Sequence, residues 1–377
     1  MPTILIATAL SGFAGAMALG WLFPLPAAIH IHLALAIGAL PLIMGAMLHF
    51  APVLTRSSAP AVPIRSLPWL AQSGGAIVVL AFVFPAFQIA GRNLAALLAL
   101  AAAVSLTLWM RRRGGQTLGN PHPGLNWYLA ALVCLILALL AILAMNLWPE
   151  HTLALKRLHL HLNIFGLIGL TAIGTVQVLL PTAAGRADAQ VARRLQQDLK
   201  PALAATLLIA LGAAWFPELG WLGLVLWLYP LYRLLTGWWR QYRHQIFNWH
   251  GAAPSLALAP LGLVLSLGLG ALHGQGYIAP GAIGHVFVSA FLLPLVTGAV
   301  SQLLPIWLRP GAQTPWHAAL RQLLGRFSGI RTLLFLGGAL LSASGMPVGM
   351  ALAGGGLLMF IGQLLAAFTI SLRIEVK

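Results

Sequence analysis

The chain has 377 residues, of which 60% are hydrophobic and only 7% are charged, and its mean hydropathy is +0.92. A water-exposed globular surface needs far more charge than this, so the composition excludes soluble enzymes and nucleic-acid-binding proteins. The 21 Lys and Arg against 5 Asp and Glu indicate basic cytoplasmic loops beside an anionic lipid surface. We therefore expect an all-α, polytopic membrane protein that resides in the lipid bilayer and binds no nucleic acid.

Apolar stretches follow one another along the chain, each near the length of about 20 residues that a membrane-crossing helix needs. Twelve spans are expected, at residues 3–22, 28–52, 67–89, 93–110, 126–148, 155–180, 201–216, 219–236, 246–272, 280–307, 329–345 and 348–372. We expect the first to be a span rather than a cleaved signal, because no basic segment precedes it. The whole chain, residues 1–377, is expected to form a single membrane domain.

Basic residues fall in alternate connections between these spans. They are Arg56, Arg65, Arg111, Arg112, Arg113, Arg186, Arg193, Arg194, Lys200, Arg240, Arg243, Arg309, Arg321, Arg326, Arg331, Arg373 and Lys377. The positive-inside rule places these connections and both termini in the cytoplasm, and we expect a multi-pass protein of the bacterial inner membrane. The five acidic residues fall at span ends or in loops, so proton pumping through intramembrane carboxylates is not expected.

An internal repeat marks three of the predicted spans. His32, His161 and His285 are each followed by Gly at the thirteenth residue and by Pro at the twentieth. Chance would place roughly 0.1 such His in a chain of this composition. The matching residues are Gly45, Gly174 and Gly298, then Pro52, Pro181 and Pro305. Successive His are four spans apart, which predicts three four-helix repeats at approximately residues 1–125, 126–245 and 246–377.

The repeated His are candidate metal or haem ligands. Helix arithmetic places all three at one depth, near the outer edge of the hydrocarbon, where an imidazole must find a partner. Neutral imidazole is a common ligand of haem iron, copper and zinc. His30 and His159 each precede an aligned His by two residues, about 200° around the helix, so the members of each pair would serve different centres. The alternative is that these His are hydrogen-bonded interfacial residues.

The pattern resembles subunit I of haem–copper oxidases, which has twelve helices and ligand His on helices 2, 6 and 10. It is also similar to the NnrS family of haem- and copper-associated membrane proteins, which show an H-x-H segment with Gly and Pro at these offsets. The resemblance implies that His32 and His285 hold a b-type haem. It also implies copper or a second haem on the side of His161 and His159. The tenth span has one His where oxidases have H-x-H, so a three-His copper centre is not expected.

Charges on the outer side suggest how a haem would be anchored. Only Arg92, Lys156 and Arg157 are expected on that side, where two haem propionates would need cationic partners. Arg157 and Arg92 are therefore candidate haem-binding residues, and Asn163 is a candidate support for His159.

Taken together, these residues predict a haem-binding redox protein for electron transfer or small-gas chemistry near the outer face. It would be an oxidoreductase or a subunit of one, with a redox protein, a quinol or other membrane subunits as partners. A non-catalytic subunit that anchors a larger redox complex and a transporter remain the alternatives.

Overall fold

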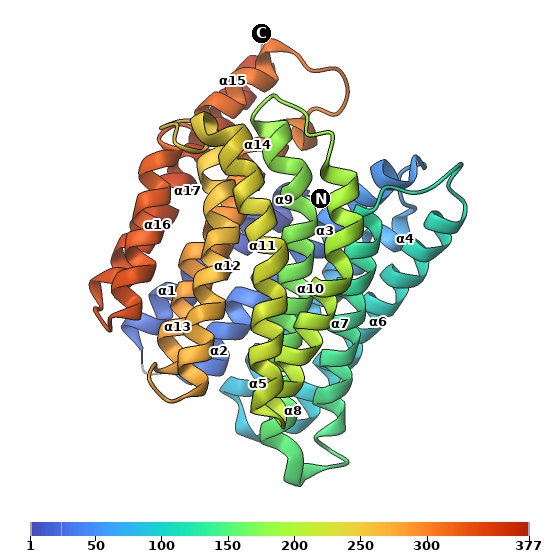
Figure 1. The fold of residues 1–377 in the computed structure, drawn as a ribbon, viewed down its shortest axis with the longest axis vertical. Coiled ribbons are helices and arrows are strands. Elements are labelled where there is room, and N and C mark those ends of the chain that lie inside the picture. The colour runs from blue at the N-terminus through green and yellow to red at the C-terminus, as the bar shows by residue number, and fades with distance from the viewer. Residues whose placement is uncertain (1, 24, 376–377) are drawn as a thin grey trace. The chain divides into compact units, whose positions relative to one another are not determined.

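A computed structural model describes residues 2–23 and 25–375, and every regular element in that part of the chain is helical. Figure 1 shows long helices joined by short connections. Eleven helical segments among the described residues are long and apolar enough to cross a membrane. They are Pro2–Gly20, Ala27–Thr55, Val62–Val83, Pro85–Gly115, Gly124–Ala144, Pro149–Ala183, Pro217–Ile246, Ala253–Gly274, Pro280–Leu308, Pro315–Ala343 and Val348–Thr369. The expectation of an all-α, multi-pass membrane protein is confirmed.

The count of spans differs from the sequence-based expectation by one. The predicted span 201–216 lies in helix α10 (Val191–Ala214), which is not among the eleven apolar segments. The first ten residues of α10 had been assigned to a cytoplasmic connection, and they contain Arg193, Arg194, Asp198 and Lys200. Their charges lower the hydropathy of the helix, although Arg194 and Asp198 are buried.

The helices group into two compact units, residues 1–175 with 190–230 and residues 176–189 with 231–377. The first unit contains α1 (Pro2–Leu22), α2 (Ala27–His32), η1 (Leu33–Ala39), α3 (Leu40–Thr55), α4 (Val62–Arg65), α5 (Leu67–Val83), η2 (Pro85–Phe87), α6 (Gln88–Gly115), α7 (Gly124–Ala144), η3 (Pro149–His151), α8 (Thr152–His161), η4 (Leu162–Leu170) and α10, with the starts of α9 (Thr171–Ala183) and α11 (Pro217–Ile246). Within it, α5 packs on α6, α6 on α7, and α8 on α7 and α10.

The second unit contains the remainder of α9 and α11, followed by α12 (Ala253–Gly274), α13 (Pro280–Val286), η5 (Phe287–Leu292), α14 (Leu293–Leu308), α15 (Pro315–Leu324), α16 (Ser328–Ala343) and α17 (Val348–Glu375). Val286, Ala290 and Ala339 form a buried cluster where the α13–η5 segment meets α16. Arg331 was expected in a connection, but it lies in α16 and is completely buried. The predicted single domain and the three repeat boundaries stay predictions.

A π-helical segment follows each of the three aligned His. His32 ends α2 and η1 begins at the next residue; His161 ends α8 and η4 begins at the next residue. His285 lies in α13, and η5 begins two residues later. A π segment accommodates an extra residue through i→i+5 hydrogen bonds, and such segments are common at functional sites. Three distant stretches of sequence therefore share a backbone irregularity at equivalent positions.

The repeated glycines also have one structural role. Gly45, Gly174 and Gly298 each face the first helix of their own predicted repeat, where a Cβ would lie 2.5 Å from Leu5, 2.7 Å from Trp127 and 2.9 Å from Leu256, respectively. The π segments contact the same three helices, η1 on α1, η4 on α7 and η5 on α12. The spacing seen in the sequence thus corresponds to the same type of helix–helix contact, formed three times.

Candidate functional site

The predicted ligand residues divide between the two units. His30 and His32 lie on α2, and His159 and His161 lie on α8, all within the first unit. His285 lies on α13 in the second unit. The pairing of His32 with His285 therefore stays a prediction, whereas α2 and α8 can be compared directly.

His32 and His161 hold their imidazoles in the same way. The Nδ1 atom of His32 lies 2.7 Å from the carbonyl oxygen of Ala28, and Nδ1 of His161 lies 2.8 Å from that of Arg157. In both cases the partner is four residues earlier on the same helix. A carbonyl oxygen only accepts hydrogen bonds, so each Nδ1 carries the proton and donates it, and the lone pair is on Nε2. This is the tautomer that a metal-ligating His needs.

His159 reaches the same tautomer through a different helix. Its Nδ1 lies 2.9 Å from the carbonyl oxygen of Ala138 on α7. The side-chain amide of Asn163 donates to the backbone oxygen of His159 at 2.8 Å and lies 3.4 Å from the ring Nδ1. Asn163 is the second residue of η4, so the π segment begins where this side chain bonds to the backbone of His159.

His32 on α2 and His159 on α8 both belong to the first unit. Both are partly buried, and the ring of His32 packs against Phe82 of α5 with ring centres 5.0 Å apart. The first unit therefore contains two half-buried His, one on α2 and one on α8, each with Nδ1 bonded to a backbone carbonyl. Sequence spacing did not predict this pair, because His159 was the unaligned member of its H-x-H segment.

His30 is held less firmly. Its Nε2 lies 3.3 Å from the carbonyl oxygen of Leu25, a long contact, and its Nδ1 is buried with no hydrogen-bond partner in the described part of the chain. One nitrogen of this ring is thus available to a further group.

The two candidate propionate partners differ in their environment. Arg92 lies near the start of α6 and donates from Nη2 to the side-chain oxygen of Asn146 at 2.6 Å. Asn146 also donates to the side chain of Asn93 at 3.0 Å. Arg157 is exposed on α8, and its carbonyl oxygen accepts the bond from His161. Arg92 therefore has a protein partner, while Arg157 presents its guanidinium to the surroundings.

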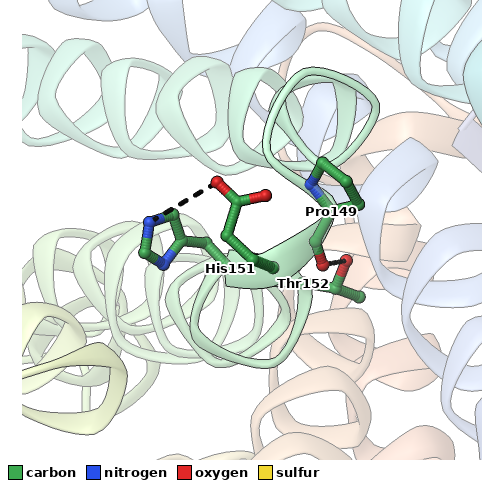
Figure 2. A network of polar contacts seen from close by, with 4 residues as sticks. Pro149, His151 and Thr152 are labelled. Carbon is green, nitrogen blue, oxygen red and sulfur yellow. Dashed lines mark hydrogen bonds and ion pairs between the residues drawn. The ribbon is translucent and has the colours of Figure 1, made fainter.

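Figure 2 shows the polar contacts in the connection ahead of α8. The Thr152 hydroxyl, at the first residue of α8, donates to the carbonyl oxygen of Pro149 at 2.7 Å. Beside it, His151 Nε2 lies 3.9 Å from a carboxylate oxygen of Glu150, with side chains 55% and 62% exposed. An ion pair this exposed contributes little to stability, so the Thr152 hydrogen bond is the more important local contact.

Among residues 2–23 and 25–375, no group of three or more His, Cys, Asp or Glu side chains is placed to hold one metal ion. The arrangement that the first unit offers is a pair of imidazoles. Comparison with known families and with curated proteins gives no match for this chain.

Proposed function

We propose that the chain is a haem-binding integral membrane redox protein that transfers electrons near the outer face of a bacterial inner membrane. The observation that carries the proposal is that His32 and His159, both in the first unit, each have Nδ1 bonded to a backbone carbonyl. A porphyrin supplies four ligands to its iron, so two imidazoles complete the coordination, and no larger cluster of protein ligands is needed.

The donor set fits a b-type haem. Both His use Nδ1 for a carbonyl, which leaves Nε2 as the ligand atom and fixes the ring orientation. The ring of His32 packs against the apolar ring of Phe82. Arg157 and Arg92 are the cations of the first unit proposed to hold the propionates, with Arg157 the more accessible of the two.

Electron transfer suits this ligand pair better than catalysis at the iron. A haem with two axial imidazoles has no open coordination position and cycles between two oxidation states. Small-gas chemistry would require a further centre, for which His161, His285 and His30 are the remaining candidates. Copper or a second haem at that centre is part of the same proposal.

The test is the optical spectrum of the purified protein, of three single variants and of one control variant. We expect a Soret band with a sharp reduced α band, and we expect His32→Ala to abolish it because His32 belongs to both candidate pairs. Loss in His159→Ala with retention in His285→Ala identifies the α2–α8 pair; the reverse identifies the His32–His285 pair. His151→Ala is the matched control, since His151 is exposed and its side chain lies beside Glu150. A wild-type protein without a haem spectrum refutes the proposal.

A further inference from the structure

A buried arginine in the second unit has no role in the proposed redox site. Arg331 lies in the first turn of α16, within the membrane-span candidate Pro315–Ala343, and is 0% exposed. An arginine stays protonated at any physiological pH, so its charge is buried together with the side chain. Ionisable side chains inside membrane helices are costly and usually serve a function.

Only part of the Arg331 guanidinium is satisfied by the protein. Its Nη1 atom donates to the carbonyl oxygen of Leu324 at 3.3 Å and to the side-chain oxygen of Gln363 on α17. Its face lies over the ring of Phe360, 4.8 Å from the ring centre. All of these partners are neutral, so the described residues give the charge no carboxylate.

The unsatisfied donors of Arg331 share one edge. Nε and Nη2 are both buried and have no hydrogen-bond partner within the described residues. These two N–H groups point the same way from the planar group and match the oxygen spacing of a carboxylate or phosphate. One turn earlier, the hydroxyl of Ser328 is 0% exposed and is likewise unpartnered. Three buried donors near the start of a helix thus lack an acceptor.

We propose that Arg331 and Ser328 form a binding site for a phosphate oxoanion. Two of its oxygens accept hydrogen bonds from Nε and Nη2 of Arg331, and a third accepts from the Ser328 hydroxyl. Because the donors are covered in this structure, the ligand enters when a covering side chain moves; Gln363, which is half-buried, bridges Arg331 and the carbonyl oxygen of Arg326.

An anionic lipid is one source of such a phosphate, and free phosphate is the other. Apolar side chains close in sequence to Arg331 are exposed: Phe327, just before α16, by 37%, and Ile330 and Leu333 on α16 by 42% and 58%. Acyl chains would cover this surface while the head group occupies the Arg331 edge.

The experiment compares two probes on the full-length protein in non-ionic detergent. Thermal unfolding is followed during titration with phosphatidylglycerol, with phosphatidylcholine as the reference lipid, and separately with sodium phosphate at constant ionic strength. The variants are Arg331→Gln and Arg331→Lys. The lysine variant keeps the positive charge but loses the paired Nε and Nη2 donors of the guanidinium. Arg326→Gln is the matched control, because it removes an exposed cation five residues away.

We expect phosphatidylglycerol or sodium phosphate, whichever binds the site, to raise the Tm of the wild type and of Arg326→Gln. The affinity of both Arg331 variants for that probe should be weaker by about tenfold or more. A response to phosphatidylglycerol alone assigns the site to lipid, and a response to sodium phosphate assigns it to the free anion. Equal responses in the wild type and Arg331→Lys, or no response in the wild type, overturn the proposal. If Arg331→Gln does not fold, Arg331→Lys decides the test.

Discussion

At the scale of single residues, His122 shows how a connection between spans can sense pH. It lies between α6 and α7, donates its backbone N–H to the carbonyl oxygen of Leu54 at 2.9 Å, and accepts the N–H of Gly124 at Nδ1, 3.1 Å away. Partial burial lowers the pKa of His122 below its ordinary value of 6.5. The folded protein therefore favours the neutral ring, whose Nδ1 lone pair caps the start of α7.

We predict that this residue makes the protein less stable in mild acid. Since the folded pKa lies below the unfolded one, the contribution is fully present above about pH 6.5 and is lost as the pH falls toward the folded pKa. His122→Asn, which keeps an acceptor near Nδ1 but does not titrate, should show a smaller fall in Tm between pH 7.5 and pH 5. An unchanged pH dependence in His122→Asn would exclude His122 as the cause.

Residue roles were predictable from the sequence only where they followed a repeat. The spacing of His, Gly and Pro singled out His32 and His161, which make the same backbone contact. It did not reveal the bond of His159 to the carbonyl oxygen of Ala138, because that contact depends on how α8 packs on α7. Arg331 was expected in a connection between spans, since charge in a sequence indicates exposure unless the fold buries it, as α16 does here.

At the scale of elements, the π segments depend on backbone contacts that only glycine permits. A Cβ on Gly12 of α1 would lie 2.7 Å from the carbonyl oxygen of Leu33 in η1. On α12, a Cβ on Gly262 would overlap the carbonyl oxygen of Ala290 in η5. In both pairs the obstacle is rigid backbone, so the helices would have to separate to admit a methyl group.

We predict that Gly262→Ala destabilises the protein by about 1–3 kcal/mol through overpacking. Gly268→Ala is the matched control on the same helix, because nothing lies within 4 Å of its Cβ position. That control should be neutral or stabilising by up to about 1 kcal/mol, as alanine is the better helix former. The pair Gly12→Ala and Gly15→Ala on α1 should behave the same way, since Gly15 is also open. If the two variants of a pair had equal denaturant midpoints, the close approach of the glycine-bearing helix to the π segment would be contradicted.

The helices themselves were predictable, whereas the π segments were not. Long apolar runs bounded by Pro, Gly and charge are enough to locate membrane helices. Nothing in a run such as that of Leu33–Ala39 distinguishes i→i+5 from i→i+4 hydrogen bonding. The change depends on the close contact between η1 and α1, which is a property of the packed structure.

At the scale of the whole molecule, the number of crossings decides which connections face the cytoplasm. Eleven segments qualify by length and composition, and α10 is the additional candidate. Its 24 residues span about 36 Å at 1.5 Å each, enough for a bilayer core of about 30 Å. Its charged residues are confined to the first ten, as expected for a helix that starts at a cytoplasmic surface.

We predict that α10 crosses the membrane. If it did not, α11 would start on the cytoplasmic side and place Arg240 and Arg243, near its other end, on the outer side, against the positive-inside rule. The test introduces a single cysteine at Ala187 or at Glu218, exposed positions before and after α10, and labels intact cells with a membrane-impermeant maleimide. The native Cys134 is buried and should stay unlabelled. A crossing helix predicts labelling at position 218 only, with position 187 reacting after the cells are opened. Labelling of both positions, or of neither, from outside would place α10 on one side of the membrane and leave eleven crossings.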